Sequence, residues 1–364
     1  PCHEKNIREN QKTQQPLALK TGQSVVLKAA LEWMGEKNAS DSVFAYVSRM
    51  QLEEPTALNK EQEDVLKLLL EGHIREQKGE EGWITFIDSS PAPTVLTESV
   101  HNLIGAQFLL DDDQAQKAAE LLNSVRMPAA AIEWAYSDAV WLRMEKDYTS
   151  ALLNSAVVRG NGLLSAQNAD GVWPATPKTN TDKLFIRPGD VTMGNIGVNA
   201  ATLAKAYLVT GDEQYRQGVK KALAAMDAMT KPAGAGPWEL PNSNADTLAA
   251  VLALETCRLL YDQTQDPEVL RMAVKFAKQV LPFIYLQEVP YRVPTLYALI
   301  PSFGATNYIR PWQGSPVMWQ GAAVAAQYIW LQQYDQSLDW EIIGNGIMHQ
   351  CINLINSEKL PGRF

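Results

Sequence analysis

The sequence has few cysteines, which limits how the fold can be held together. Three cysteines occur among 364 residues, and this number is too small for a disulfide framework. Cys257 and Cys351 lie within apolar helical runs, so we expect both to be buried as small hydrophobic side chains. Covalent cross-links therefore play no part in the predicted fold.

Cys2 lies near the start of the chain, in a polar arm over residues 1–16 that is rich in Gln, Asn and Lys. This composition predicts a disordered arm. Two interpretations of Cys2 stay open, a lipid-attachment cysteine and a thiol without a function. Because the chain begins at Pro1 and not at Met, we expect an exported protein, secreted or periplasmic, with a lipid anchor at Cys2 as one option.

Long hydrophobic runs and an excess of positive charge are also absent. No apolar run reaches the roughly 18 residues of a membrane-spanning helix, so we expect no membrane span. The chain has 32 Lys and Arg against 41 Asp and Glu, with a net charge of −9. This balance argues against a nucleic-acid-binding protein, which usually has a basic face. It does not exclude an acidic substrate, because local fields can oppose the net charge.

Strand-like alternation is scarce, and two kinds of helical pattern alternate along the chain. One kind is apolar on nearly every side, which is typical of helices covered by protein all round. The other has apolar residues at spacings of three and four, which predicts one buried face and one exposed face. The first kind occupies 198–209, 247–260 and 321–331, and the second occupies 212–229, 266–284 and 338–355.

The links from the first kind to the second are short and acidic. Asp212, Asp266 and Asp339 stand where amphipathic helices begin, and an Asp at this position accepts hydrogen bonds from free N–H groups. The run Asp111-Asp112-Asp113 fits the same place. We interpret it as a helix start and not as a metal or pyrophosphate site.

The return connections are long, and they cover 78–93, 167–190, 230–244 and 286–316. This alternation predicts an all-α fold, an α/α toroid of six or seven helical hairpins in a single domain over residues 17–364. All long connections would then lie at one edge, where the inner helices begin. Helix N-termini carry partial positive charge, so this edge should favour anions.

The stretch Gln167-Asn168-Ala169-Asp170-Gly171-Val172-Trp173-Pro174 resembles short corners of two known families. One is the Gln-Trp repeat of triterpene cyclases, and the other is the Asn-Gly-Gly-Trp-Pro corner of α/α-toroid polysaccharide lyases acting on pectate. Both resemblances imply an α/α toroid, and similar toroids include six-hairpin glycosidases. The Asp-x-Asp-Asp motif of the cyclases does not occur in the long connections. The pectate-lyase corner has a second Gly where Val172 stands.

The long connections combine aromatic, acidic and basic side chains, a mixture that suits sugars. The predicted substrate-binding residues are Glu98, Asp170, Asp190, Trp173, Trp238, Trp312 and Trp319. For Asp170 and Trp173 the alternative is a helix-ending corner with the indole as a plug. His101 follows Glu98 on one helix face, and the two are either a functional pair or a core histidine with its carboxylate partner.

Two chemistries fit these residues. Glu239 and Asp246 are the predicted acid and base of a hydrolase, although Asp246 also suits a helix cap. Tyr308 or His101 as base, with Arg310 neutralising a uronate carboxylate, would suit a lyase. We therefore expect a glycan-processing enzyme without a metal or other cofactor, with an oligo- or polysaccharide substrate and acidic sugars favoured. The alternatives are a non-catalytic toroid that binds a glycan or a peptide, and a terpenoid-cyclase-like enzyme.

Overall fold

The regular structure of the protein is helical. The computed structural model describes residues 20–24, 38–55, 57–75, 103, 106–107, 109–124, 150–177, 186–234, 243–288, 295–302 and 316–354. The α-helices there are α2 (Ala39–Val47), α3 (Lys60–Arg75), α5 (Asp112–Ser124), α7 (Ser150–Ala166), α9 (Met193–Thr210), α10 (Glu213–Asp227), α11 (Thr247–Thr264), α12 (Pro267–Val280), α13 (Met318–Leu331) and α14 (Trp340–Asn353). A 3₁₀ turn, η3 (Leu281–Phe283), follows α12. These ranges otherwise contain three isolated β-bridges and no named strand, which confirms the all-α prediction.

Inner and outer helices alternate from α9 to α14, as predicted. Every residue of α11 from Ala249 to Cys257 is buried. In α12 the buried apolar positions Val269, Phe276 and Val280 share one face, whereas Arg271 on another face is exposed. Cys257 and Cys351 are buried and free, as expected.

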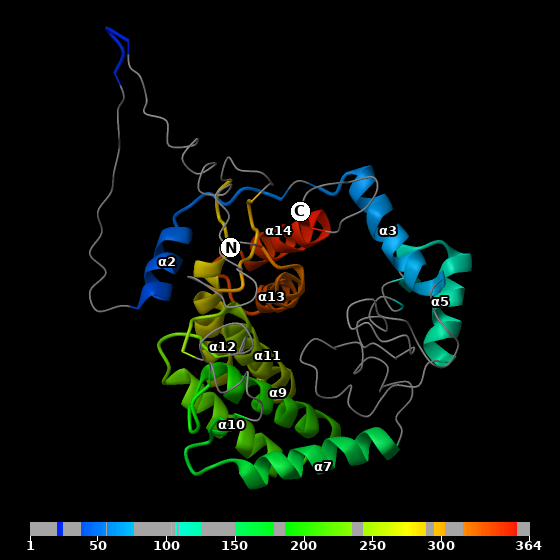
Figure 1. The fold of residues 1–364 in the computed structure, drawn as a ribbon, viewed down its shortest axis with the longest axis vertical. Coiled ribbons are helices and arrows are strands. Elements are labelled where there is room, and N and C mark those ends of the chain that lie inside the picture. Colours follow the sequence, from blue (N-terminus) through cyan, green and yellow to red (C-terminus); the bar gives the residue numbers. More distant parts are fainter. Residues whose placement is uncertain are drawn as a thin grey trace.

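The helices follow one another in space in a defined order (Figure 1). Helix α7 packs on α9 and α10, α9 on α11, α11 on α12 and α13, and α13 on α14. Helix α14 in turn contacts α3, which packs on α5. Side-by-side inner–outer hairpins are the architecture of an α/α toroid. The count of six or seven hairpins stays a prediction, because residues 125–149, between α5 and α7, lie outside the described ranges.

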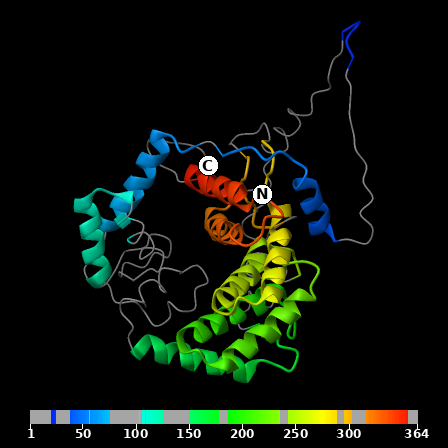
Figure 2. The ribbon, with the colours of Figure 1, turned by 180° about the vertical axis from the view of Figure 1, so that it is seen from behind.

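The N-terminal part of the described chain lies across the C-terminal half, as the reverse view in Figure 2 also shows. Helix α2 packs on α12 and η3, and Lys278 Nζ lies 3.8 Å from the ring centroid of Phe44. Further along, Tyr297 Oη donates a 2.5 Å hydrogen bond to the carbonyl of Glu53. Distant segments of the sequence therefore hold each other in place.

Acidic N-caps begin the outer helices, as the short links predicted. Asp212 accepts a hydrogen bond from Gln214 N at 2.9 Å, and Asp339 accepts one from Ile342 N at 3.1 Å. Asp111 does the same for Gln114 N at 3.0 Å. The Asp triplet is thus a helix start, as interpreted from the sequence.

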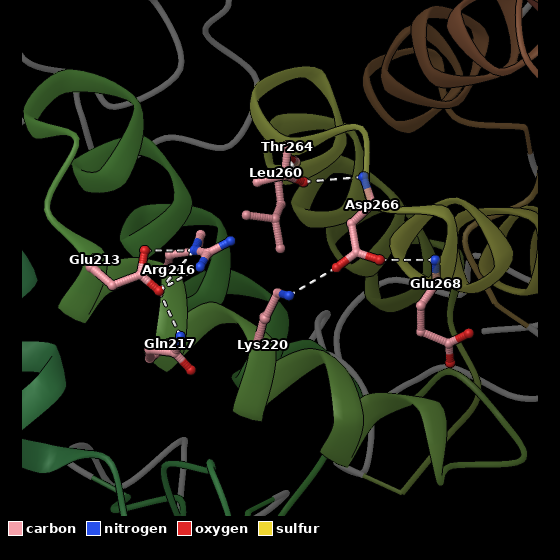
Figure 3. Close-up of polar contacts among 8 residues, drawn as sticks. All are labelled: Glu213, Arg216, Gln217, Lys220, Leu260, Thr264, Asp266 and Glu268. Carbon is pink, nitrogen blue, oxygen red and sulfur yellow. Dashed lines mark hydrogen bonds and ion pairs between the residues drawn. The ribbon is translucent and has the colours of Figure 1, made fainter.

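The carboxylate of Asp266 has two partners, one on its own helix and one on α10 (Figure 3). One carboxylate oxygen accepts from Glu268 N at 3.1 Å. The other lies 2.8 Å from Lys220 Nζ, so that it joins the start of α12 to the middle of α10. The bond to Lys220, and then the bond from the Glu268 backbone, lower the pKa of Asp266.

This lowered pKa makes the contribution of Asp266 to stability pH-dependent. A carboxyl whose pKa is lower in the folded state stabilises the fold above its unfolded pKa, about 3.9, and this contribution is lost as the pH falls through the folded value. The pair is partly exposed, with side chains 39% and 24% accessible, so its contribution should be about 0.2–1 kcal/mol.

Asp266→Asn keeps a capping side chain but removes the ion pair. We expect the variant to be less stable than the wild type near pH 7, by up to about 1 kcal/mol. Near pH 3, below the unfolded pKa of about 3.9, the difference should shrink, because the unfolded chain then binds the proton that the ion pair keeps off Asp266 in the folded protein. Urea denaturation at both pH values measures this. An equal loss at both would contradict an electrostatic role for Asp266.

Candidate functional site

Three of the four long connections lead to the N-termini of α9, α11 and α13, which lie at one edge as predicted. Backbone hydrogen bonds join them: Gly194 N to Ala233 O (2.9 Å), Asp246 N to Pro232 O (3.0 Å), Thr247 N to Pro301 O (2.9 Å) and Val317 N to Leu299 O (2.9 Å). We call this region, residues 192–194, 232–233, 245–247, 299–302 and 317–320, the rim. The fourth connection, 78–93, lies outside the described residues.

Three helix N-termini contribute to the rim, and their capping differs. Thr192 caps α9 by accepting from Asn195 N at 3.3 Å, and Asp246 caps α11 by accepting from Ala249 N at 2.8 Å. Val317, at the start of α13, provides no side-chain cap. The partial positive charges of three helices therefore lie at one edge.

Of the predicted catalytic residues, Asp246 is the one that lies within the described part of the chain. Its side chain is 3% exposed, and its backbone pairs with that of Ser302 in an antiparallel bridge. The carboxylate caps α11, so the alternative role considered from the sequence is present. A catalytic role for the same carboxylate stays a prediction.

Two buried polar side chains at the rim were not singled out from the sequence. Ser302 is 1% exposed and Gln320 is 3% exposed. Neither Ser302 Oγ nor Gln320 Oε1 has a hydrogen-bond partner among the described residues. A buried polar atom without a partner costs about 1–3 kcal/mol, and such atoms need an explanation such as a functional role or an ordered water.

The sequence gives an indication for one of these two residues and none for the other. Ser302 lies in the stretch 301–314 of the long connection 286–316, whose length and aromatic content favour a functional segment over a simple connector. Gln320 lies in the first turn of α13 next to Trp319, and no spacing marks it. Its burial results from packing between helices and is not visible in one sequence.

The corner at Gln167–Pro174 ties α7 to α10. Gln167 Nε2 donates to the carbonyls of Gly171 and Gly218, both at 2.9 Å. The indole of Trp173 is 7% exposed and donates to Leu163 O at 2.9 Å. This is the geometry of the structural plug that was considered as the alternative for Trp173.

Two other predicted substrate-binding residues lie in turns. Asp170 is exposed in the Gln167–Pro174 corner. Asp190 is partly buried just before α9, and its Oδ2 accepts from Arg187 N at 2.9 Å. Substrate binding by Asp170, Trp173 or Asp190 stays a prediction.

The remaining predicted site residues cannot be placed relative to the rim. Those that lie outside the described residues are Glu98, His101, Trp238, Glu239, Tyr308, Arg310 and Trp312, together with the side chain of Trp319. Among the residues that the structure describes, no three His, Cys, Asp or Glu side chains form a metal-binding group. No helix in these ranges is both long enough and apolar enough to cross a membrane.

Comparison with known proteins gives a similarity of fold. No family model and no curated protein sequence matches the chain. One similar solved structure is an unsaturated glucuronyl hydrolase specific for heparin, with 12% identity, a TM-score of 0.49, and coverage of 80% of this chain and 83% of that one. Another, an unsaturated glucuronyl hydrolase from Streptococcus agalactiae, has 11% identity, a TM-score of 0.48, and coverage of 86% and 89%. Both similarities concern the fold at low sequence identity, and no activity is transferred from them.

Ala substitutions at Gly171 and Gly189 test whether the corner at Gln167–Pro174 is tightly packed. Both have positive φ, +79° and +87°, so Ala at either position costs about 1–2 kcal/mol in backbone strain. A Cβ on Gly171 would also lie 2.6 Å from the backbone carbon of Lys221, whereas one on Gly189 meets nothing within 4 Å.

We therefore expect Gly171→Ala to lower the free energy of unfolding by roughly 1–3 kcal/mol more than Gly189→Ala does. Urea denaturation of the two variants gives this difference directly. Equal losses would show that the corner is not tightly packed against α10.

Proposed function

We propose that this protein is a glycan-processing enzyme whose site lies at the rim, with acidic sugars favoured. The observation that carries the proposal is the grouping of Asp246, Ser302 and Gln320, three buried polar side chains, where the long connections meet the inner helices. A carboxylate, a hydroxyl and an amide are suitable groups for binding sugar hydroxyls.

The preference for acidic sugars rests on local charge. The N-termini of α9, α11 and α13 favour an anion at this edge. Two of the basic residues in the long connections are described, Arg187 and Lys231, and both are exposed. Lys231 Nζ donates to Ser243 O at 2.7 Å, so a cation stands beside the connection that leads into Asp246.

Hydrolysis and elimination both stay possible chemistries for this site. In a hydrolase, Asp246 would act with Glu239, one as acid and the other as base or nucleophile. In a lyase, Tyr308 or His101 would remove the proton next to the uronate carboxylate while Arg310 neutralises that carboxylate. The distant likeness to glucuronyl hydrolases does not decide between them.

The test is turnover of neutral and uronic oligosaccharides, with and without an unsaturated terminal glucuronyl residue. Release of reducing ends reports hydrolysis, and a gain of ultraviolet absorbance from a new unsaturated uronate reports elimination. Binding without turnover would overturn the enzyme proposal and favour a glycan-binding protein. Neither binding nor turnover on any glycan would overturn the proposed function altogether.

Asp246→Asn separates the catalytic role from the capping role, because Asn caps a helix as well as Asp does. For a hydrolase that uses Asp246, we expect turnover to fall by roughly 10²–10⁴-fold, with thermal stability nearly unchanged. The matched control is Asp212→Asn, since Asp212 caps α10 at a short link away from the rim. Wild-type turnover in Asp246→Asn would remove this residue from the mechanism.

A further inference from the structure

Two charged side chains meet inside the inner layer. Lys205 Nζ on α9 lies 3.0 Å from Glu255 Oε1 on α11, and the two side chains are 2% and 3% exposed. The ion pairs that involve α10 and α12 have side chains that are 24% exposed or more. The Lys205–Glu255 pair is therefore of a different kind from these surface pairs.

The pair lies away from the outer layer. On α9, Leu203 and Ala206 face the outer helices, because a Cβ on Gly218 of α10 or on Gly160 of α7 would touch them. Lys205 instead continues the row of Val198 and Thr202, at spacings of four and three. Val198 is 44% exposed, so this row faces away from the outer helices.

Stability alone does not account for such a pair. Removing two charges from water costs about as much as their attraction returns, and well-packed apolar residues in their place are often as stable or more stable. A buried polar contact can instead specify how two helices align.

The contact between α9 and α11 includes small residues at a point where the two backbones lie close together. A Cβ on Gly197 would lie 2.8 Å from Leu252 Cβ, so the backbones approach closely. The buried small residues of the two helices include Gly197, Ala200, Ala201 and Ala204 on α9, and Ala249, Ala250 and Ala253 on α11. Small side chains offer shallow ridges and grooves, and a slip by one turn would displace one helix by about 5.4 Å.

The rim requires one particular alignment. Two adjacent carbonyls connect the helices: Pro232 O accepts from Asp246 N of α11 at 3.0 Å, and Ala233 O accepts from Gly194 N of α9 at 2.9 Å. Because the two acceptors are neighbours in the chain, both bonds can form only when the N-termini of α9 and α11 are level.

We propose that Lys205 and Glu255 are positioning residues that set the axial alignment of α9 against α11 and so hold the rim in order. The inference deepens the proposed function, since it names the residues that align the site around Asp246. The alignment itself is measurable without any substrate.

The experiment compares Lys205→Met, Glu255→Leu, the double variant and the wild type. Each single variant leaves one buried charge without this partner, so its denaturation midpoint should fall. The double variant should recover the wild-type midpoint or exceed it. Amide hydrogen exchange at Gly194 and Asp246 should nevertheless stay faster than in the wild type, by about tenfold.

The control is Lys220→Met with Asp266→Asn, which removes an interhelical pair of similar length between α10 and α12. It should leave exchange at Gly194 and Asp246 unchanged. Wild-type exchange at these amides in the Lys205→Met/Glu255→Leu protein would overturn the proposal. So would a double variant that loses as much stability as the two single variants added together, since Lys205 and Glu255 would then not act as a pair.

Turnover provides a separate readout once a glycan substrate is known. The double variant should then have a lower kcat at unchanged global stability, because Asp246 is displaced with the start of α11. If no glycan is turned over, the proposed function fails while the exchange experiment still decides the role of the pair.

Discussion

The burial of α11 on all sides is the constraint on which the rest of the structure depends. Each fully buried Leu on this helix gains about 1.5–3 kcal/mol relative to exposure to water. The gain requires α9, α12 and α13 to be in place together, because each covers a different side. A single hairpin cannot provide that cover, so the inner layer exists only as an array. The same array brings the starts of α9, α11 and α13 to one edge.

Local signals in the sequence were sufficient for the helices and their caps. The spacing of Val269, Phe276 and Val280 predicted the buried face of α12, and the acidic links predicted the caps at Asp212, Asp266 and Asp339. These features depend on residues within a few positions of one another. The start of α13 was less accurate, because the helix begins at Met318, before the apolar run 321–331 that marked it.

Contacts between distant residues were not predictable in the same way. Lys205 and Glu255 lie in runs that were interpreted as apolar nearly all round, and each is explained by a partner on another helix. The sequence indicated Asp246 and the connection that contains Ser302, but no feature of the neighbouring sequence indicates Gln320. Trp173 had two possible roles, and its hydrogen bond to Leu163 O, which fits the structural one, depends on how the chain turns back.

The contacts of the N-terminal segment affect the order in which the chain can fold. Tyr46 bonds to Gln287 and the carbonyl of Glu53 bonds to Tyr297, across separations of 241 and 244 residues. Gln62 reaches Asn353, 291 residues away. During synthesis the residues of α2 and α3 emerge long before these partners, and contacts of such long range slow folding. Until α14 has been synthesised, the apolar faces of α2 and α3 lack these partners and are open to association with other chains.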